Sequence, residues 1–216
     1  VGQSQKTVFN LSLQPSYKIN KNLKISSRFS YSMNNMSENA FSPMYGVAPL
    51  IDLDQMYISK NYVKTQFAKQ VSIFSDTRVN WQKMQGYNAF ELNAGVRYLK
   101  DTYESEFALG HNTGSDQVKE MSNSLSFKSV GGLDEPYKLL TYYGMFNYSL
   151  KNKYFVEATI NAETNSKFGK EAVEGFKMLG VSWALFPSLN AAWIVSSEEM
   201  MKNVDFVDVL KLRAGF

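Results

Sequence analysis

The sequence predicts an all-β fold, an antiparallel up-and-down sheet of about eight strands that belongs to a transmembrane β-barrel. Three observations carry this prediction. Several segments alternate apolar and polar residues with a period of two, the mark of a strand with unlike faces. Along the chain, short polar turns alternate with long polar connections. Aromatic residues make up 14% of the 216 residues, while Cys is absent, and no apolar run approaches the roughly 18 residues of a membrane-spanning helix.

The N-terminal segment predicts a hairpin. Alternate residues from Phe9 to Ile19 are apolar or aromatic, and the alternation resumes from Leu23 to Met33 with Ser27 as the polar exception. The turn Asn20-Lys21-Asn22 separates the two strands, and its Asn residues tolerate left-handed backbone geometry. A stretch without period then follows from about Asn34 to Lys64, and we interpret it as a long outer loop of a barrel.

The middle of the chain predicts two further strands joined by a short turn near residues 85–88. The first runs from about Gln66 to Lys83, and the second from about Phe90 to Gly110. We read the second as one continuous strand through Lys100-Asp101-Thr102, because a turn there would place the short turns on opposite rims. Residues 111–138 are polar and rich in Gly and Ser, which predicts a second outer loop.

The C-terminal third predicts a hairpin of residues 141–150 and 154–162, a third loop from about Asn165 to Leu179, and a strand from Val181 to Val195. Pro187 cannot donate a ladder hydrogen bond, so a bulge or a local break in pairing is expected there. Ser196 with Glu199 is a capping-box pattern that predicts a single helical turn. Residues 210–214 begin a last strand.

This C-terminal region resembles a known family. The residues that carry the resemblance are Tyr142-Tyr143-Gly144-Met145-Phe146-Asn147-Tyr148, Tyr154-Phe155-Val156-Glu157-Ala158, Phe186-Pro187-Ser188, Ala191-Ala192-Trp193, Ser196-Ser197-Glu198-Glu199-Met200-Met201-Lys202 and Leu210-Lys211-Leu212-Arg213-Ala214. In order and spacing they are similar to the barrel of SusC/RagA-type TonB-dependent transporters of Bacteroidota outer membranes. The resemblance covers Thr141 to Phe216 well, the strands of residues 86–110 more weakly, and is generic before them.

The resemblance implies that residues 1–216 are one partial barrel domain. A full transporter of this kind has about 22 strands around a plugged lumen, so the plug and the remaining strands are expected outside this sequence. The chain departs from the family at Asn161-Ala162-Glu163-Thr164-Asn165-Ser166-Lys167-Phe168. The family has an Arg-Ala-Asp-Gly-Ser-Ser-Arg-Phe stretch there, so the chain is expected to be a divergent member.

The candidate functional residues are aromatic. Tyr residues near predicted strand ends suit the membrane interfaces, namely Tyr17, Tyr31, Tyr98, Tyr148 and Tyr154. In the first outer loop, Phe41, Tyr45, Tyr57 and Tyr62 are candidates for contact with a ligand or a lid protein, and the alternative is that the loop packs on itself. No catalytic, cofactor or metal residue is predicted: His111 has no His or Cys nearby, Ser188 lacks a nucleophile context, and Asp52 and Asp54 are read as solvated acids.

The function implied by the resemblance is import of a glycan or peptide nutrient across the outer membrane, without enzymatic activity. The implied partners are a SusD-like surface lipoprotein, TonB acting through the plug, and the lipid and lipopolysaccharide of the membrane. The net charge of +3 without a basic block argues against nucleic acid. Three alternatives remain open: a structural subunit of an envelope secretion or assembly complex, a small complete eight-strand barrel, and a soluble carbohydrate-binding β-sandwich.

Overall fold

The computed structural model describes residues 2–52, 57–121, 125, 127–168, 175–178, 180–202 and 206–216, with the side chains of Asp52, Tyr57 and Phe127 left out of that description. The described part is almost entirely β-structure, which confirms the predicted fold class. Its elements are β1 (Gly2–Leu13), β2 (Ser16–Lys18), β3 (Leu23–Ser42), β4 (Leu50–Asp52), β5 (Tyr57–Ser59), β6 (Tyr62–Gln85), β7 (Asn88–His111), β8 (Phe127–Leu150), β9 (Tyr154–Asn165), β10 (Phe176–Met178), β11 (Val181–Ile194), the 3-10 helices η1 (Val195–Ser197) and η2 (Glu199–Met201), and β12 (Lys211–Gly215).

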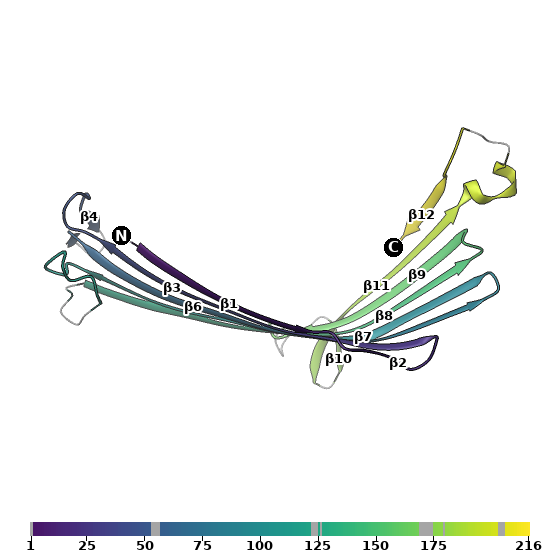
Figure 1. Cartoon of the computed structure of the whole chain (residues 1–216), viewed down its shortest axis with the longest axis horizontal. Coiled ribbons are helices and arrows are strands. Elements are labelled where there is room, and N and C mark those ends of the chain that lie inside the picture. The colour runs from purple at the N-terminus through teal and green to yellow at the C-terminus, as the bar shows by residue number, and fades with distance from the viewer. Residues whose placement is uncertain are drawn as a thin grey trace. The chain divides into compact units, whose positions relative to one another are not determined.

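The strands follow an up-and-down path. Ten of them form one sheet in the order β1-β3-β6-β7-β8-β9-β11-β10, with β2 paired to β3 and β12 paired to β11. Figure 1 shows β7, β8, β9 and β11 side by side in this order. The remaining two strands, β4 and β5, form a separate hairpin within the connection between β3 and β6. Among the residues described, none of the helices is long and apolar enough to cross a membrane.

The chain divides into two compact units. Unit 1 comprises residues 1–11, 31–72 and 100–136, and it contains the long connections between β3 and β6 and between β7 and β8. Unit 2 comprises residues 12–30, 73–99 and 137–216, and it contains the short turns that join β6 to β7 and β8 to β9. The predicted alternation of short turns and long connections is therefore confirmed.

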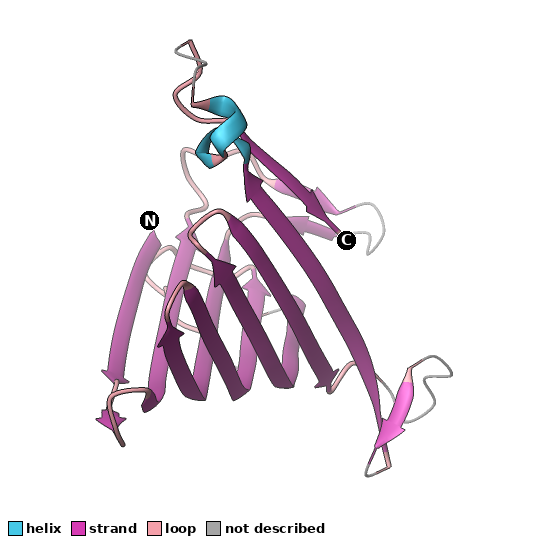
Figure 2. Cartoon of the chain, turned by 90° about the vertical axis from the view of Figure 1, so that its right-hand side faces the viewer, coloured by secondary structure: helices cyan, strands magenta, loops and turns pink. Residues whose placement is uncertain are grey.

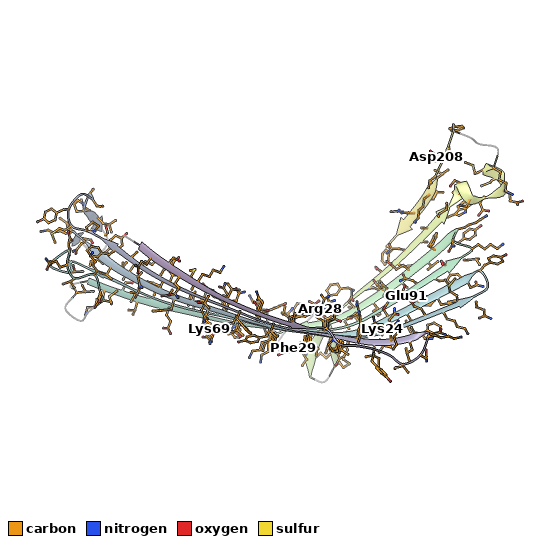
Figure 3. All side chains as sticks on the ribbon, viewed as in Figure 1. Lys24, Arg28, Phe29, Lys69, Glu91 and Asp208 are labelled. Carbon is orange, nitrogen blue, oxygen red and sulfur yellow. The ribbon has the colours of Figure 1, made fainter. Side chains whose placement is uncertain are left out.

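The sheet of unit 2 has one apolar face and one polar face. Registered pairs put Tyr148, Val156 and Ala191 on the same side, and they put Asn147, Glu157 and Asn190 on the other. Figure 3 shows the same division on β3, where Arg28 and its neighbour Phe29 project to opposite sides. We call the first side the apolar face; its residues are Phe90, Leu92, Ala94, Val96 and Tyr98 on β7, Leu140, Tyr142, Gly144, Phe146 and Tyr148 on β8, Tyr154, Val156, Ala158, Ile160 and Ala162 on β9, and Leu185, Pro187, Leu189, Ala191 and Trp193 on β11.

The apolar face has the height of a membrane-spanning band. On each of the four strands β7, β8, β9 and β11 the apolar run covers nine residues, as from Phe90 to Tyr98, and a tilted transmembrane strand needs roughly 9–11. The large side chains on this face are open to the surroundings, for example Ile160 at 51% and Leu189 at 52% of their full exposure. An apolar surface that no other part of the described chain covers is the surface that a bilayer would cover.

Two outer connections are shorter than the sequence predicted. The loop expected over residues 34–64 was too long, because β3 continues to Ser42 and β6 begins at Tyr62. The loop expected over residues 111–138 likewise ends early, because β8 begins at Phe127. The hydrogen bonds between strand backbones do not require an apolar face. A strand with polar residues on both faces therefore keeps these hydrogen bonds but lacks the period-two alternation from which a strand is predicted. The continuous strand through residues 100–102 is confirmed by β7.

Pro187 does not interrupt its strand, so the expected bulge or break is wrong. The ladder between β9 and β11 runs without a gap from Ala184 to Trp193, and Pro187 stands opposite Ile160. The amide of Leu189 donates toward the β12 side, to the carbonyl of Phe216 at 2.9 Å. Backbone groups two residues apart point to the same side of a strand, so the missing N–H of Pro187 also points there, three residues beyond Asn190, where the registered β11–β12 pairs end.

The connection after β11 forms the predicted helical turn but not the predicted capping box. It consists of η1 and η2, drawn in cyan in Figure 2, and neither has a side-chain cap. Ser196 lies inside η1 rather than before it, and Glu199 instead accepts a hydrogen bond from Lys202 at 3.0 Å. A capping box requires the Ser to precede the first helical residue. Here the first helical residue is Val195, which lies before Ser196.

The two short hairpin turns at Asn20 and Lys151 are built differently. Lys151 and Asn152 have positive φ of 51° and 52°, and they are the central residues of a turn that the Lys153 amide closes by donating to the Leu150 carbonyl at 3.0 Å. The turn at Asn20-Lys21-Asn22 does not use left-handed geometry, since none of the three is among the described residues with positive φ. Instead the Asn20 side-chain oxygen accepts from the amides of Asn22 and Leu23 at 2.8 and 2.9 Å, which is an Asx turn.

Candidate functional site: the polar face and the outer-loop network

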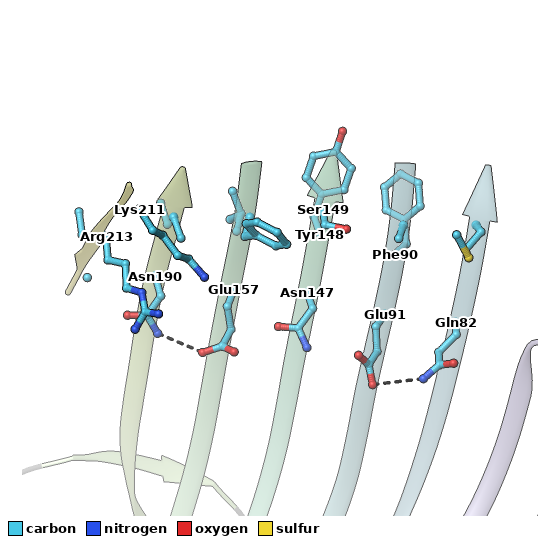
Figure 4. A pocket seen from close by; sticks show the side chains of 18 of the residues that line it. Gln82, Phe90, Glu91, Asn147, Tyr148, Ser149, Glu157, Asn190, Lys211 and Arg213 are labelled. Carbon is cyan, nitrogen blue, oxygen red and sulfur yellow. Dashed lines mark hydrogen bonds between the residues drawn. The ribbon is translucent and has the colours of Figure 1, made fainter. Parts of the chain in front are cut away.

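A row of amide and carboxylate side chains crosses the polar face of unit 2. Asn147 on β8 stands opposite Glu157 on β9, which stands opposite Asn190 on β11. Figure 4 shows these three with Gln82 and Glu91 on the adjoining strands, and with Lys211 and Arg213 of β12 at the end of the row. Together they line an open hollow of about 860 Å³.

Hydrogen bonds within this row hold the two carboxylates in place. Glu91 Oε1 accepts from the amide groups of Asn80 and Asn93, both at 3.0 Å, and from Gln82 at 3.5 Å. Glu157 Oε1 accepts from Asn190 at 3.1 Å. Carboxylates and amides offer acceptors and donors at fixed spacing. The row can therefore contact a polar surface or solute through many hydrogen bonds, and it contains none of the nucleophile–base pairs that catalysis needs.

A second cluster on the polar face joins three strands. Tyr143 Oη on β8 donates to Asp76 Oδ1 on β6 at 2.7 Å, and Arg97 Nε on β7 donates to Asp76 Oδ2 at 3.1 Å. The guanidinium of Arg97 also lies 5.4 Å from the centre of the Tyr143 ring. Tyr143 reaches Asp76 by crossing over β7 at Gly95, where an added Cβ would stand 2.6 Å from the Tyr143 ring and hydroxyl. We call Asp76, Gly95, Arg97 and Tyr143 the cross-strand brace.

In unit 1 the outer connections are tied together by a buried polar network, which we call the outer-loop network: Ser59, Asn61, His111, Thr113 and Asp116. Asn61 is 1% exposed and donates to Thr113 Oγ1 at 2.8 Å and to Asp116 Oδ1 at 3.3 Å, while its oxygen accepts from the Thr113 amide at 2.8 Å. Ser59 Oγ lies 2.8 Å from His111 Nδ1. The network thus joins the β4–β5 hairpin to the connection that follows β7.

Asn61 should be the residue on which this network depends most. Replacement by Ala in the full-length protein removes three hydrogen bonds and leaves the part-buried Thr113 amide without its acceptor, a loss of about 1–3 kcal/mol. We expect the amides of residues 112–116 to exchange with deuterium roughly tenfold to a hundredfold faster. Asn39→Ala, at an exposed site on β3 of the same unit, is the matched control; equal exchange in both variants would contradict the proposed role.

The loop aromatics singled out from the sequence lie in different surroundings. Phe41 is buried at the end of β3, with the Lys119 ammonium 5.9 Å from its ring. Tyr62 begins β6 and its ring centre is 6.2 Å from that of His111. Tyr45 is 82% exposed, and the side chain of Tyr57 lies outside the described residues. Among these four aromatic residues, Tyr45 is therefore the one whose described side chain is exposed enough to contact a partner.

Residues that carry the polar contacts were not singled out from the sequence. His111 was assigned to a loop but lies buried at the end of β7. The side chain of Asp52, and Asp54 entirely, lie outside the described residues. Asp76, Arg97 and Asn61 look like ordinary polar residues of their segments. Their alternation with apolar residues could have placed Asp76 and Arg97 on the polar face, but their cross-strand partners depend on register.

Aromatic residues gather where the apolar face of unit 2 meets the short turns. Tyr148 Oη donates to Asn88 Oδ1 at 2.7 Å. The rings of Tyr154 and Trp193 stack at 6.3 Å, and both residues donate to Glu198 Oε1, at 2.6 and 3.1 Å. Rings with an apolar body and a polar tip suit a membrane–water boundary. The interfacial positions predicted for Tyr148 and Tyr154 are consistent with these contacts.

Glu198 should make the stability of this corner depend on pH. Hydrogen bonds from Tyr154, Trp193 and Lys153 lower the pKa of its carboxyl from 4.5 to about 2. A carboxyl whose pKa is lower in the folded protein adds stability at pH values above its unfolded pKa, and that stability is lost as the pH falls toward the folded pKa. We expect the thermal midpoint of the full-length protein to fall between pH 4.5 and 2, and to fall less in Glu198→Gln. An identical pH profile in both proteins would contradict this.

Comparison with known proteins gives relatives and fold neighbours of one class. No family model matches the chain. It is 35% identical over 78 residues to the TonB-dependent receptor SusC of Bacteroides thetaiotaomicron, which is 36% of this chain and 7% of that receptor. It is 27% identical over 104 residues to the TonB-dependent receptor P39 of Formosa agariphila, which is 47% of this chain and 9% of that receptor.

Two solved structures share the fold. A chain of the RagAB peptide importer in its open-open state matches all of this chain with a TM-score of 0.80 at 15% identity, over 22% of its own length. BauA, the ferric preacinetobactin receptor from Acinetobacter baumannii, matches 91% of this chain with a TM-score of 0.55 at 11% identity, over 29% of its own length. The chain therefore spans less than a third of each of these proteins.

Proposed function

Because this chain is a homologue of the SusC-type TonB-dependent receptors and has the fold of part of their outer-membrane barrel, we propose that it forms wall and outer loops of an importer for glycans or peptides. The single observation that supports this most is that the fold match extends over the whole chain. The two unlike faces of unit 2 agree with it, since a barrel wall must meet lipid on one side and a polar lumen on the other.

The whole 216-residue chain, on this proposal, belongs to one barrel domain whose plug and further strands lie elsewhere in the protein. The apolar face contacts lipid and lipopolysaccharide in the outer membrane. A SusD-like surface lipoprotein is the proposed partner at the outer connections, where Tyr45 is exposed, and TonB is the proposed energy source acting through the plug. No step of this function requires a catalytic residue or a cofactor, and the proteins that the chain resembles are receptors and transporters.

The proposal is tested with the full-length receptor in its own outer membrane. Affinity purification should recover a surface lipoprotein in near-equal amount, and deletion of the receptor gene should abolish growth on at least one oligosaccharide or peptide supplied as sole nutrient. Co-purification of secretion or assembly components, together with unchanged growth on every such nutrient, would overturn it.

The open strand path of the described residues, in which β1 pairs with β3 and β12 with β11, gives no support to a closed eight-strand barrel.

A further inference from the structure

Two arginines on the polar face of unit 2 have no carboxylate partner. Arg28 lies on β3 and Arg78 on β6, and these strands are neighbours in the sheet. Arg28 donates to Gln14 Oε1 at 3.2 Å, and Arg78 donates to Ser26 Oγ at 3.2 Å. Both partners are neutral. Within the described part of the chain, neither guanidinium forms an ion pair.

The register brings the two guanidinium groups to one place. Ser27 Oγ lies 2.9 Å from Thr77 Oγ1 on the opposite, apolar side of the same strands, so Ser26 faces Arg78 and Arg28 faces Asp76 in the antiparallel ladder. Arg28 and Arg78 are thus diagonal neighbours, and such residues lie about 7–8 Å apart in an antiparallel ladder. Both line a hollow of about 150 Å³ together with Gln14, Ser26 and Arg97.

The nearest acid does not neutralise this pair. Asp76 lines the same hollow, but its two oxygens already accept from Tyr143 and Arg97 in the cross-strand brace. The hollow therefore holds three guanidinium groups and one carboxylate, an excess of two positive charges. Like charges on neighbouring strands repel, and guanidinium groups remain protonated at any physiological pH. A bound anion would remove this repulsion.

We propose that Arg28 and Arg78 form a binding site for a small oxyanion, a carboxylate or sulfate group carried by a solute in the barrel interior. The planar fork of each guanidinium matches the oxygens of such a group and can bind it with two parallel hydrogen bonds. Gln14 and Ser26 hold the two arginines from the side, so the free N–H groups remain available to the anion. The site does not depend on which nutrient the receptor imports.

Sulfate is the probe that tests this site. The thermal midpoint of the purified full-length receptor is measured as sodium sulfate replaces sodium chloride at constant ionic strength, because a ligand that binds the folded state raises the midpoint. The expected result is a rise in the wild type and at least a roughly tenfold loss of apparent sulfate affinity in the double variant Arg28→Gln/Arg78→Gln, since both charged hydrogen-bond donors of the site are removed. The matched control is Lys18→Gln/Lys24→Gln, which removes the same charge from a registered pair of exposed residues in the same unit that lines neither hollow.

The outcomes distinguish a specific anion site from a general effect of net charge and from a structural role of the two arginines. Loss of the sulfate effect in the Arg28/Arg78 variant alone supports the site. An equal loss in the control overturns it, because the effect then follows net charge. Absence of a sulfate effect in the wild type also overturns it, and a lower midpoint of the Arg28/Arg78 variant would then assign these arginines to a structural role through Gln14 and Ser26. If that variant fails to fold, Arg28→Lys/Arg78→Lys keeps both charges and should still weaken sulfate, because the fork is lost; an unchanged affinity contradicts the site.

Discussion

Arginine in place of Ala158 is expected to lower the folding stability of the full-length receptor in a bilayer by about 2–4 kcal/mol. Ala158 is the middle residue of the nine-residue apolar run on β9, from Tyr154 to Ala162. Its registered neighbours on the apolar face are Phe146 and Leu189. A guanidinium at this height has no polar partner on that face, and the cost of a charge on the lipid side is greatest at the bilayer midplane.

The matched variant is Met145→Arg, because Met145 lies at the same height on the polar face, opposite Thr159 of β9. Urea titration of both variants reconstituted into lipid vesicles measures the difference. We expect a large loss of stability for Ala158→Arg and a much smaller one for Met145→Arg. Equal losses, or the reverse order, would mean that the apolar face of unit 2 does not meet lipid.

Alanine in place of Gly95 should destabilise the full-length receptor by about 1–3 kcal/mol, the usual cost of overpacking. The added Cβ would stand 2.6 Å from the Tyr143 ring and hydroxyl and 2.7 Å from the backbone oxygen of Thr77. Tyr143 can turn away only by giving up its hydrogen bond to Asp76. The Thr77 oxygen belongs to the neighbouring strand β6, so it can move only if β6 and β7 separate.

Gly144→Ala is the control for this change. Gly144 lies on β8 of the same unit, and the nearest atom to an added Cβ is Ile160 Cγ2 at 3.6 Å, an ordinary contact. Since Gly within a strand is itself unfavourable, Gly144→Ala should leave the thermal midpoint unchanged or raise it. A second readout is Tyr143 fluorescence or exchange of its hydroxyl proton, which should change only in Gly95→Ala. Similar midpoints for the two variants would contradict the cross-strand brace.

The fold could be predicted where one strand has two unlike faces, and less well elsewhere. The alternation from Phe90 to Tyr98 predicts both the strand and the face that meets lipid. Residues 34–42 continue β3 without such a pattern, because both faces of that part carry polar residues. The helical turn after Trp193 was predicted from its residues, but its start at Val195 was not, since the capping-box pattern places Ser196 before the first helical residue.

The candidate site was harder to predict than the fold, because its contacts cross between strands. Arg28 and Gln14 are 14 residues apart in the chain, and Asp76 and Tyr143 are 67 apart. Alternation within a strand assigns each of them to a face, but only the register between strands brings them together. Phe41 illustrates the converse: its aromatic character made it a candidate for contact with a partner, and its side chain is buried at the end of β3.

The cross-strand brace ties the evolution of three strands together. Tyr143 reaches Asp76 only because Gly95, on the strand between them, has no side chain. A substitution at Gly95 would remove the selective advantage of a tyrosine at residue 143, and loss of that tyrosine would free residue 95 to acquire a side chain. Among related barrels, the identities of these three residues should therefore change together, although no two of them are adjacent in the sequence.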